Sequence, residues 1–284
     1  LRFEGPLKVQ RLFYPEKKLP GRVDPCHLYL LHPPGGLVSG DRLGHDISLA
    51  DGAHALITTP AATKIYGARS GQAPQTVSGH IQAGDQSLLE WLPQGTIVFS
   101  GARANLASTF DLHPGARALG CDFVALGRPA SNEPFAAGTF RQLTQIRRHG
   151  RLLFHELLNL SGGQPLLASP FGLMGRPVLA LFWALGRQND STDAAALSAA
   201  SRLLALREAF GGPPGQRPAA TGSPSAGLSA PGPICSVTLK GELLLARALA
   251  NSLEEAEAFR LQVWSAVRPA LLGRETLSPH IWSH

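Results

Sequence analysis

Cysteine is scarce in this sequence of 284 residues, with only Cys26, Cys121 and Cys235 present and none close to another. An odd, dispersed set excludes both the CxxC spacing of a zinc knuckle and a disulfide framework. Charge is also sparse, since Asp, Glu, Lys and Arg make up 16% of the residues and hydrophobic residues 44%. Disordered chains show the opposite balance. The composition therefore predicts a folded cytoplasmic protein with reduced thiols.

Long apolar runs and basic runs are missing as well. The longest apolar stretch, around Val178–Leu185, falls far short of the roughly 18 residues that a transmembrane helix needs. The net charge is +6, but the basic residues are spread along the chain, and the densest cluster is Arg147, Arg148 and Arg151. We interpret the excess charge as a solvated basic face, and expect neither a membrane segment nor a nucleic-acid partner.

The usual signatures of catalytic and nucleotide sites are absent. The sequence has no GxxxxGK[ST] phosphate loop, no GxGxxG, no GxSxG and no HExxH. Cys26 and His27 are adjacent, so that in a strand they face opposite ways and cannot act on each other. The ten histidines are scattered, and turn or surface positions are expected for them rather than a metal site. These absences predict a protein that is not an enzyme and binds no cofactor tightly.

What the sequence does contain, up to about residue 169, is a succession of short segments typical of strands. Glycine and proline separate these segments every eight to twelve residues or so, which is typical of all-β proteins. The clearest segments are His54–Thr59, Leu88–Leu92, Thr96–Phe99, Ala107–Leu112 and Gln142–Ile146. A sandwich, a barrel and a β-helical stack all fit this pattern. No repeat of fixed period is visible, so the pattern does not predict a regular solenoid.

The chain changes character after this region. Asp193–Phe210 predicts an amphipathic helix, with Ser191, Thr192 and Asp193 as candidates for its N-cap. Gly211–Pro233 consists almost wholly of Gly, Pro, Ala and Ser, which predicts a flexible surface loop.

The last part of the chain predicts two strands and a second helix. Ile234–Leu239 has the pattern of a strand, and Leu243–Leu249 fits a second strand better than the start of a helix. Ser252–Val267 predicts a helix that Ser252 caps and Pro269 ends. The fold class expected is therefore mainly β, a β-helical or stacked-sheet body, with an α+β annex of two helices in the C-terminal half.

Three acidic residues interrupt apolar β segments. Glu90 lies in LLEWL, Asp122 in GCDFVALG and Glu156 in LLFHELLNL. Burying a carboxylate is costly unless it is paired, hydrogen-bonded, hydrated or bound to metal. Two interpretations remain open: each acid faces solvent on an alternating strand, or the acids face an internal polar passage.

Four segments carry a resemblance to a known family, and two shorter ones support it: VQRLFYPE (Val9–Glu16), CHLYLLHPPGGLVSGD (Cys26–Asp41), ITTPAATKIY (Ile57–Tyr66), LEWLPQ (Leu89–Gln94), LGRP (Leu126–Pro129) and PHIW (Pro279–Trp282). In this order and spacing the chain resembles the UreD family of urease accessory proteins, also called UreH, from about Arg2 to Trp282. The resemblance implies one domain over residues 1–284, with the loop 211–233 as an insertion. GARSG after Tyr66 departs from the family, which usually has Arg directly after this Tyr.

The resemblance implies a function that the residues alone do not show. It implies a non-catalytic, mostly β scaffold that binds the urease apoprotein and UreF, through which the nickel-carrying GTPase UreG joins. Nickel would be in transit through an internal polar tunnel, and the positions matched to that tunnel are Asp41, Thr63, Asp122 and Glu156. Carboxylates and hydroxyls suit a transient path because they hold nickel more loosely than a Cys/His cluster would.

Two alternatives to the conduit stay open. One is a purely structural clamp on urease, with nickel taking another route. The other is a metallo-hydrolase on a β scaffold, using Asp41, Asp122, Glu156 and a histidine, although no ligand pair at standard spacing supports it. Whether the chain dimerises within an accessory complex is also left open.

Overall fold

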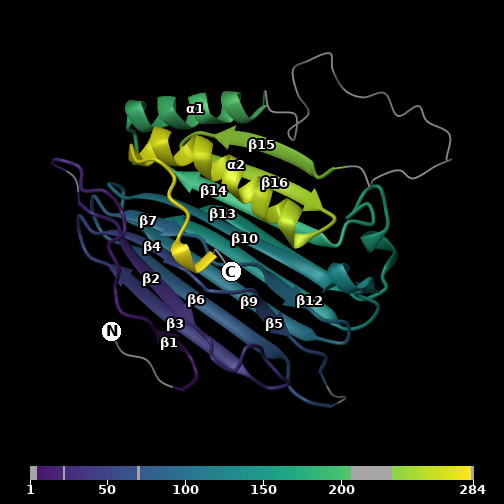
Figure 1. Ribbon diagram of the computed structural model, residues 1–284. Coiled ribbons are helices and arrows are strands. Elements are labelled where there is room, and N and C mark those ends of the chain that lie inside the picture. The colour runs from purple at the N-terminus through teal and green to yellow at the C-terminus, as the bar shows by residue number, and fades with distance from the viewer. Residues whose placement is uncertain (1–4, 22, 69–70, 206–231, 283–284) are drawn as a thin grey trace.

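A computed structural model describes residues 5–21, 23–68, 71–205 and 232–282. Two β-sheets lie face to face in it, and two α-helices cover the outer side of one sheet (Figure 1). In the described residues the larger sheet has eleven strands: β1 (Lys8–Val9), β2 (Cys26–Leu31), β4 (His54–Thr58), β5 (Thr63–Ile65), β7 (Leu88–Trp91), β8 (Thr96–Val98), β10 (Arg117–Arg128), β11 (Glu133–Pro134), β14 (Val178–Leu185), β15 (Ile234–Lys240) and β16 (Leu243–Ala250).

The smaller sheet has five strands within the same ranges: β3 (Arg42–Leu49), β6 (Gln75–Ala83), β9 (Arg103–Leu112), β12 (Thr139–Arg148) and β13 (Arg151–Ser161). The chain alternates between the sheets from β2 to β12, and successive strands of the run β3, β6, β9 and β12 pair in parallel. The parallel pairs β2–β4, β4–β7 and β7–β10 form the facing run. This solenoid-like arrangement confirms a mainly β body of stacked sheets.

The lengths of the rungs explain why no period is visible in the sequence. Arg42 pairs with Thr76, Gln75 with Ala104 and Arg103 with Thr139, so that the steps in the smaller sheet are 34, 29 and 36 residues. Unequal connections between strands absorb the difference. A solenoid can therefore be built here without sequence self-similarity, which is the signal that reveals regular repeats.

The parallel run ends where the chain reverses. β13 pairs antiparallel with β12 and forms the edge of the smaller sheet. β14 then returns to the larger sheet, antiparallel to β10, and β16 and β15 complete that sheet. The predicted strand at Leu243–Leu249 is confirmed as β16.

Helix α1 (Ser191–Ala205) covers β15, and it starts with a different cap from the three that the sequence suggests. A carboxylate oxygen of Asp190 accepts a hydrogen bond from the backbone N of Asp193 at 3.0 Å, which makes Asp190 the N-cap. The side chain of Asp193 instead binds Arg117. The end of the predicted helix, residues 206–210, and nearly all of the predicted loop 211–233 lie outside the described residues.

Helix α2 (Leu253–Leu272) confirms the second predicted helix and the cap at Ser252, but the prediction that Pro269 ends it is wrong. The helix continues through Pro269 and ends at Gly273, which adopts φ +62°. Leu271 and Leu272 are buried in the core. Burial of two leucines, at about 1.5–3 kcal/mol each, offsets the roughly 3 kcal/mol that a proline costs inside a helix.

Three short 3-10 helices complete the described elements: η1 (Pro129–Ser131), η2 (Pro165–Leu167) and η4 (His280–Trp282). The larger sheet is buried on both faces, against α1 and α2 on one side and against the smaller sheet on the other. Strand β10 accordingly has an almost continuous apolar sequence, as sheets with two covered faces require. Neither α-helix in the described ranges combines the length and the apolar composition that a bilayer crossing requires.

Candidate functional site

The three acids that interrupt the strands do not share one environment. Glu90 points toward α2, where it is fully buried and binds Arg268. Asp122 and Glu156 point into the space between the two sheets, where they line one cavity together. The solvent-facing interpretation is therefore wrong for Glu90 and Asp122, whereas Glu156 keeps part of its side chain exposed.

Two cavities meet at Asp122. The first has a volume of about 260 Å³ and the second about 320 Å³, and both are lined by Asp122 and Gln142. The first reaches the β5 side of the sandwich, where Thr63 lies, and the second reaches β13 and β15. We call the two cavities together the passage.

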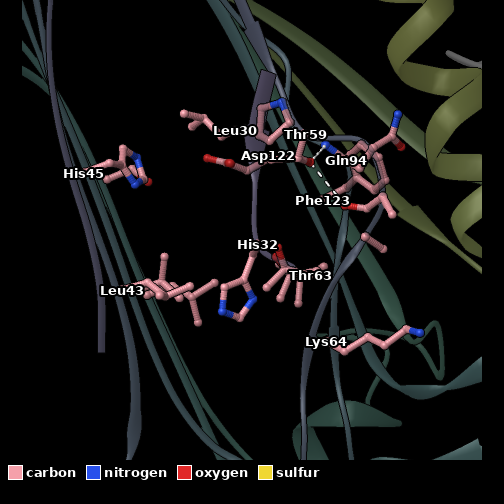
Figure 2. A pocket seen from close by; sticks show the side chains of 18 of the residues that line it. Leu30, His32, Leu43, His45, Thr59, Thr63, Lys64, Gln94, Asp122 and Phe123 are labelled. Carbon is pink, nitrogen blue, oxygen red and sulfur yellow. Dashed lines mark hydrogen bonds between the residues drawn. The ribbon is translucent and has the colours of Figure 1, made fainter. Parts of the chain in front are cut away.

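The first cavity has a mainly apolar wall into which both sheets contribute a few polar side chains, shown in Figure 2. The Asp122 carboxylate points into the open space, on the side where His45 lies. Thr63 and His32 lie farther along the same cavity. Apolar side chains such as Leu43 form the rest of the wall. The predicted site residues Thr63 and Asp122 are therefore brought together.

Asp122 lies in surroundings that oppose its ionisation. Its pKa is raised to about 6, mainly by burial and in part by the charge of Glu156, while the Trp91 indole opposes the rise. Oδ2 of Asp122 and Nε1 of Trp91 both lack a hydrogen bond of standard geometry within the described residues. The side chain keeps some accessible surface, because that surface faces the cavities. An unpaired carboxylate in a hollow interior is able to attract a cation.

Replacing Asp122 by asparagine is expected to stabilise the protein at pH 7.5. The pKa of Asp122 is raised from 3.8 in the unfolded chain, so the native state loses stability as the pH rises from about 4 through about 6. Asparagine does not ionise, so the D122N variant has no charged side chain to bury at this position. Thermal unfolding of D122N and wild type between pH 4 and pH 8 measures this, and the melting temperatures should converge near pH 4. An advantage of D122N that is the same at every pH would contradict the prediction.

Glu156, in β13, is positioned by an arginine from the larger sheet. Nη2 of Arg247 donates to Oε1 of Glu156 at 2.9 Å, and Nε donates to the same oxygen at 3.1 Å. Thr144 lies opposite Glu156 in the neighbouring strand, and both line the second cavity. The second cavity thus contains a carboxylate whose charge is partly balanced.

Asp41, the fourth predicted residue, lies away from the other three. Its Oδ2 accepts a hydrogen bond from the backbone N of Val38 at 2.9 Å, in the turn that precedes β3. It lines neither of the two cavities. Asp122 therefore shares one cavity with Thr63 and the other with Glu156, whereas Asp41 has a local role in the turn.

Sequence reasoning missed the histidines of the first cavity. The His45 ring stacks on Trp91 with 5.2 Å between ring centroids, and burial lowers the pKa of His45, which keeps the imidazole neutral near pH 7. His27 and His54, expected at turns or on the surface, are instead buried in β2 and β4. The alternation of His27 with apolar neighbours in CHLYLL was the available signal.

The described residues contain no group of three or more His, Cys, Asp or Glu side chains placed to hold a metal ion. The donors of the passage are spread along it, as single carboxylates, hydroxyls and imidazoles. Such donors favour weak and exchangeable contacts with a divalent ion over a closed coordination shell.

Fold and site together define a class of protein: a solenoid-like β scaffold with two cavities that share Asp122 in their walls. The sequence matches the family described as UreD urease accessory protein over residues 1–283. It is 42% identical to the urease accessory protein UreD of Pseudomonas aeruginosa over 282 residues, which cover 99% of this chain and 88% of that protein. Identity is 39% both to the UreD of Pseudoalteromonas translucida and to that of Chromohalobacter salexigens, each covering 99% of this chain and 82% of the relative. The chain belongs to the UreD family of urease accessory proteins.

Proposed function

We propose that this urease accessory protein is a non-catalytic scaffold that binds the urease apoprotein and UreF, and that nickel delivered by UreG passes through the passage to urease. The observation that carries the proposal is the meeting of two cavities at Asp122. A cation entering at Thr63 would find the Asp122 carboxylate midway and Glu156 beyond it.

The electrostatics of the passage support transit over storage. Ionised Asp122 is costly to keep at neutral pH, and a divalent cation beside it would offset that cost. Glu156 is already paired with Arg247, so it would compete weakly for the ion. A pathway needs contacts that are favourable enough for entry and weak enough for release.

The pairing of Glu156 with Arg247 also favours the rival function, a clamp that holds urease open without carrying nickel. If Glu156 serves only to fix β13 against β16, its loss would loosen the sandwich and leave nickel loading unchanged. The conduit and the clamp therefore differ in what happens to nickel when the complex is intact.

The test replaces Asp122 and Glu156 by alanine, singly and together, and measures nickel per urease active site beside the amount of assembled complex. Each single variant should lower nickel content to well under half of wild type while the complex with UreF and urease still assembles. The double variant should lower it further. Folding should suffer by no more than about 1–3 kcal/mol per site.

Asp46 provides the matched control, because its side chain is 91% exposed on the outer face of β3. D46A should leave nickel loading unchanged. Normal nickel content in the double variant, with the complex intact, would reject the conduit and leave the clamp.

A further inference from the structure

The connection between β13 and β14, residues 162–177, is held in one conformation by its own hydrogen bonds. The backbone N of Leu173 donates to the carbonyl of Leu166 at 3.1 Å, and that of Gly175 donates to Leu167 at 2.9 Å. The side chain of Leu173 is buried in the core between the sheets. The loop is therefore held by the buried Leu173 side chain and by backbone hydrogen bonds between its two halves.

This ordered loop presents apolar side chains to solvent. Phe171 is 96% exposed, and Leu166 and Met174 on either side of it are 44% and 47% exposed. We call these three residues the apolar knob. Met174 adopts φ +55°, a left-handed conformation that costs a non-glycine residue of order 1 kcal/mol or more. Exposure of an aromatic ring and backbone strain both raise the free energy of this loop conformation in the isolated chain. Binding of a partner to the apolar knob would lower it again by burying the ring.

Positive charge lies at the same end of the smaller sheet. Thr139 pairs with Ser161, the last residue before the loop, and also with Arg103. Arg103 and Arg141 are exposed on the outer face of this end, and neither forms an ion pair with a carboxylate within the described residues. The loop thus leaves the smaller sheet at an end that carries arginine side chains, and arginine is favoured beside aromatic anchors in protein interfaces.

We propose that the apolar knob is the docking anchor of this chain on the urease apoprotein, seated in an apolar cleft with acidic side chains at its rim. The inference rests on the proposed function and adds the surface that performs the binding. A second copy of this chain is a poor occupant, since arginines would face arginines across a twofold interface and the net charge is +6. The relatives are described as accessory to urease, which makes that protein the partner to test.

The location of the loop also fits this role. It leads directly into β14, and Leu179, the second residue of β14, lines the second cavity. Leu158, near the end of β13, lines it as well. The loop therefore joins two strands that both line the second cavity, in which Glu156 is found.

The test measures binding of Phe171→Ala, Arg141→Glu and wild type, each purified as the full chain in complex with UreF, to immobilised urease apoprotein. F171A should weaken binding by about 30-fold or more, as expected for an aromatic hot spot. R141E should weaken it less and remove part of its salt dependence. Leu203→Ala, at a half-exposed leucine of α1, is the matched control and should bind like wild type.

Several outcomes would overturn the inference. If F171A binds urease within twofold of wild type, urease is rejected as the occupant. The same holds if F171A fails to retain UreF at the wild-type ratio. Loss of self-association alone in size-exclusion chromatography would assign the knob to a second copy. Loss of binding only to vesicles containing anionic lipid would assign it to a membrane. Wild type that fails to bind urease at all would reject the proposed function as well.

Discussion

Replacing Glu90 by alanine is expected to lower the free energy of unfolding by about 3–5 kcal/mol, because it leaves a buried arginine without its main counter-charge. Nε of Arg268 donates to Oε2 of Glu90 at 2.8 Å, and Nε1 of Trp264 donates to the same oxygen at 3.0 Å. Nε2 of His54 lies 2.9 Å from Oε1. Burial raises the pKa of Glu90, but His54 and Arg268 more than offset this and lower the pKa to about 2.

Thermal and urea unfolding of E90A would measure the loss, which corresponds to a fall in melting temperature of roughly 6–15 °C. Glu133→Ala is the matched control, because Glu133 pairs with Arg128 at the surface, where solvent screens the pair, and its loss should leave the melting temperature almost unchanged. The double variant E90A/R268A should be much less destabilised than the sum of the single variants. Strict additivity, or a loss no greater than that of E133A, would show that the buried pair is not coupled.

Replacing Phe110 by alanine is expected to lower the free energy of unfolding by about 3–5 kcal/mol as well, through a cavity in the core. Phe110 is fully buried between the sheets. Its ring centroid lies 6.1 Å from that of Trp91 and 4.7 Å from that of Trp183, so it joins two aromatic residues of the larger sheet. Gly120 leaves room for this contact, since a Cβ there would meet the Trp183 indole at 2.5 Å.

The same substitution at Phe171 is the control that the chain itself offers. F171A removes an identical side chain from solvent-exposed surroundings and should change stability by less than about 0.5 kcal/mol. Chemical unfolding of both variants gives the comparison. If F110A lost less than about 1 kcal/mol, the aromatic contacts between the sheets would not be a main support of the sandwich.

The sequence indicated the strands and helices well, because their signals are local. β-forming residues located β4, a short apolar run located β7 and alternation located β12, while the Ser252 cap located the start of α2. The proline rule failed at Pro269, since burial of the following leucines depends on contacts that are distant in sequence. Tertiary packing overrides local preference in such places.

The sequence indicated which residues to consider for the candidate site, but not how they are arranged in space. A carboxylate within an apolar run is visible in any sequence, yet only the pairing of strands separates Glu90, which faces α2, from Asp122, which faces the passage. His45 gave no local signal in the sequence, because its place in the cavity wall depends on stacking against Trp91 of the opposite sheet. Asp41 was matched by motif alone, and the structure places it in a turn outside both cavities.

The buried charges around Glu90 have one more consequence, which concerns synthesis on the ribosome. Nη2 of Arg268, in α2, also donates to Glu16, so a contact that encloses 252 positions of the chain joins the beginning of the β body to its last helix. The Arg274 guanidinium donates to the carbonyl of Val23 at 2.9 Å. A nascent chain cannot complete this contact until α2 has left the exit tunnel. Until then Glu16 keeps only its contact with His27, and the early rungs must wait for the last helix before the charge cluster is complete, which leaves them open to misfolding during translation.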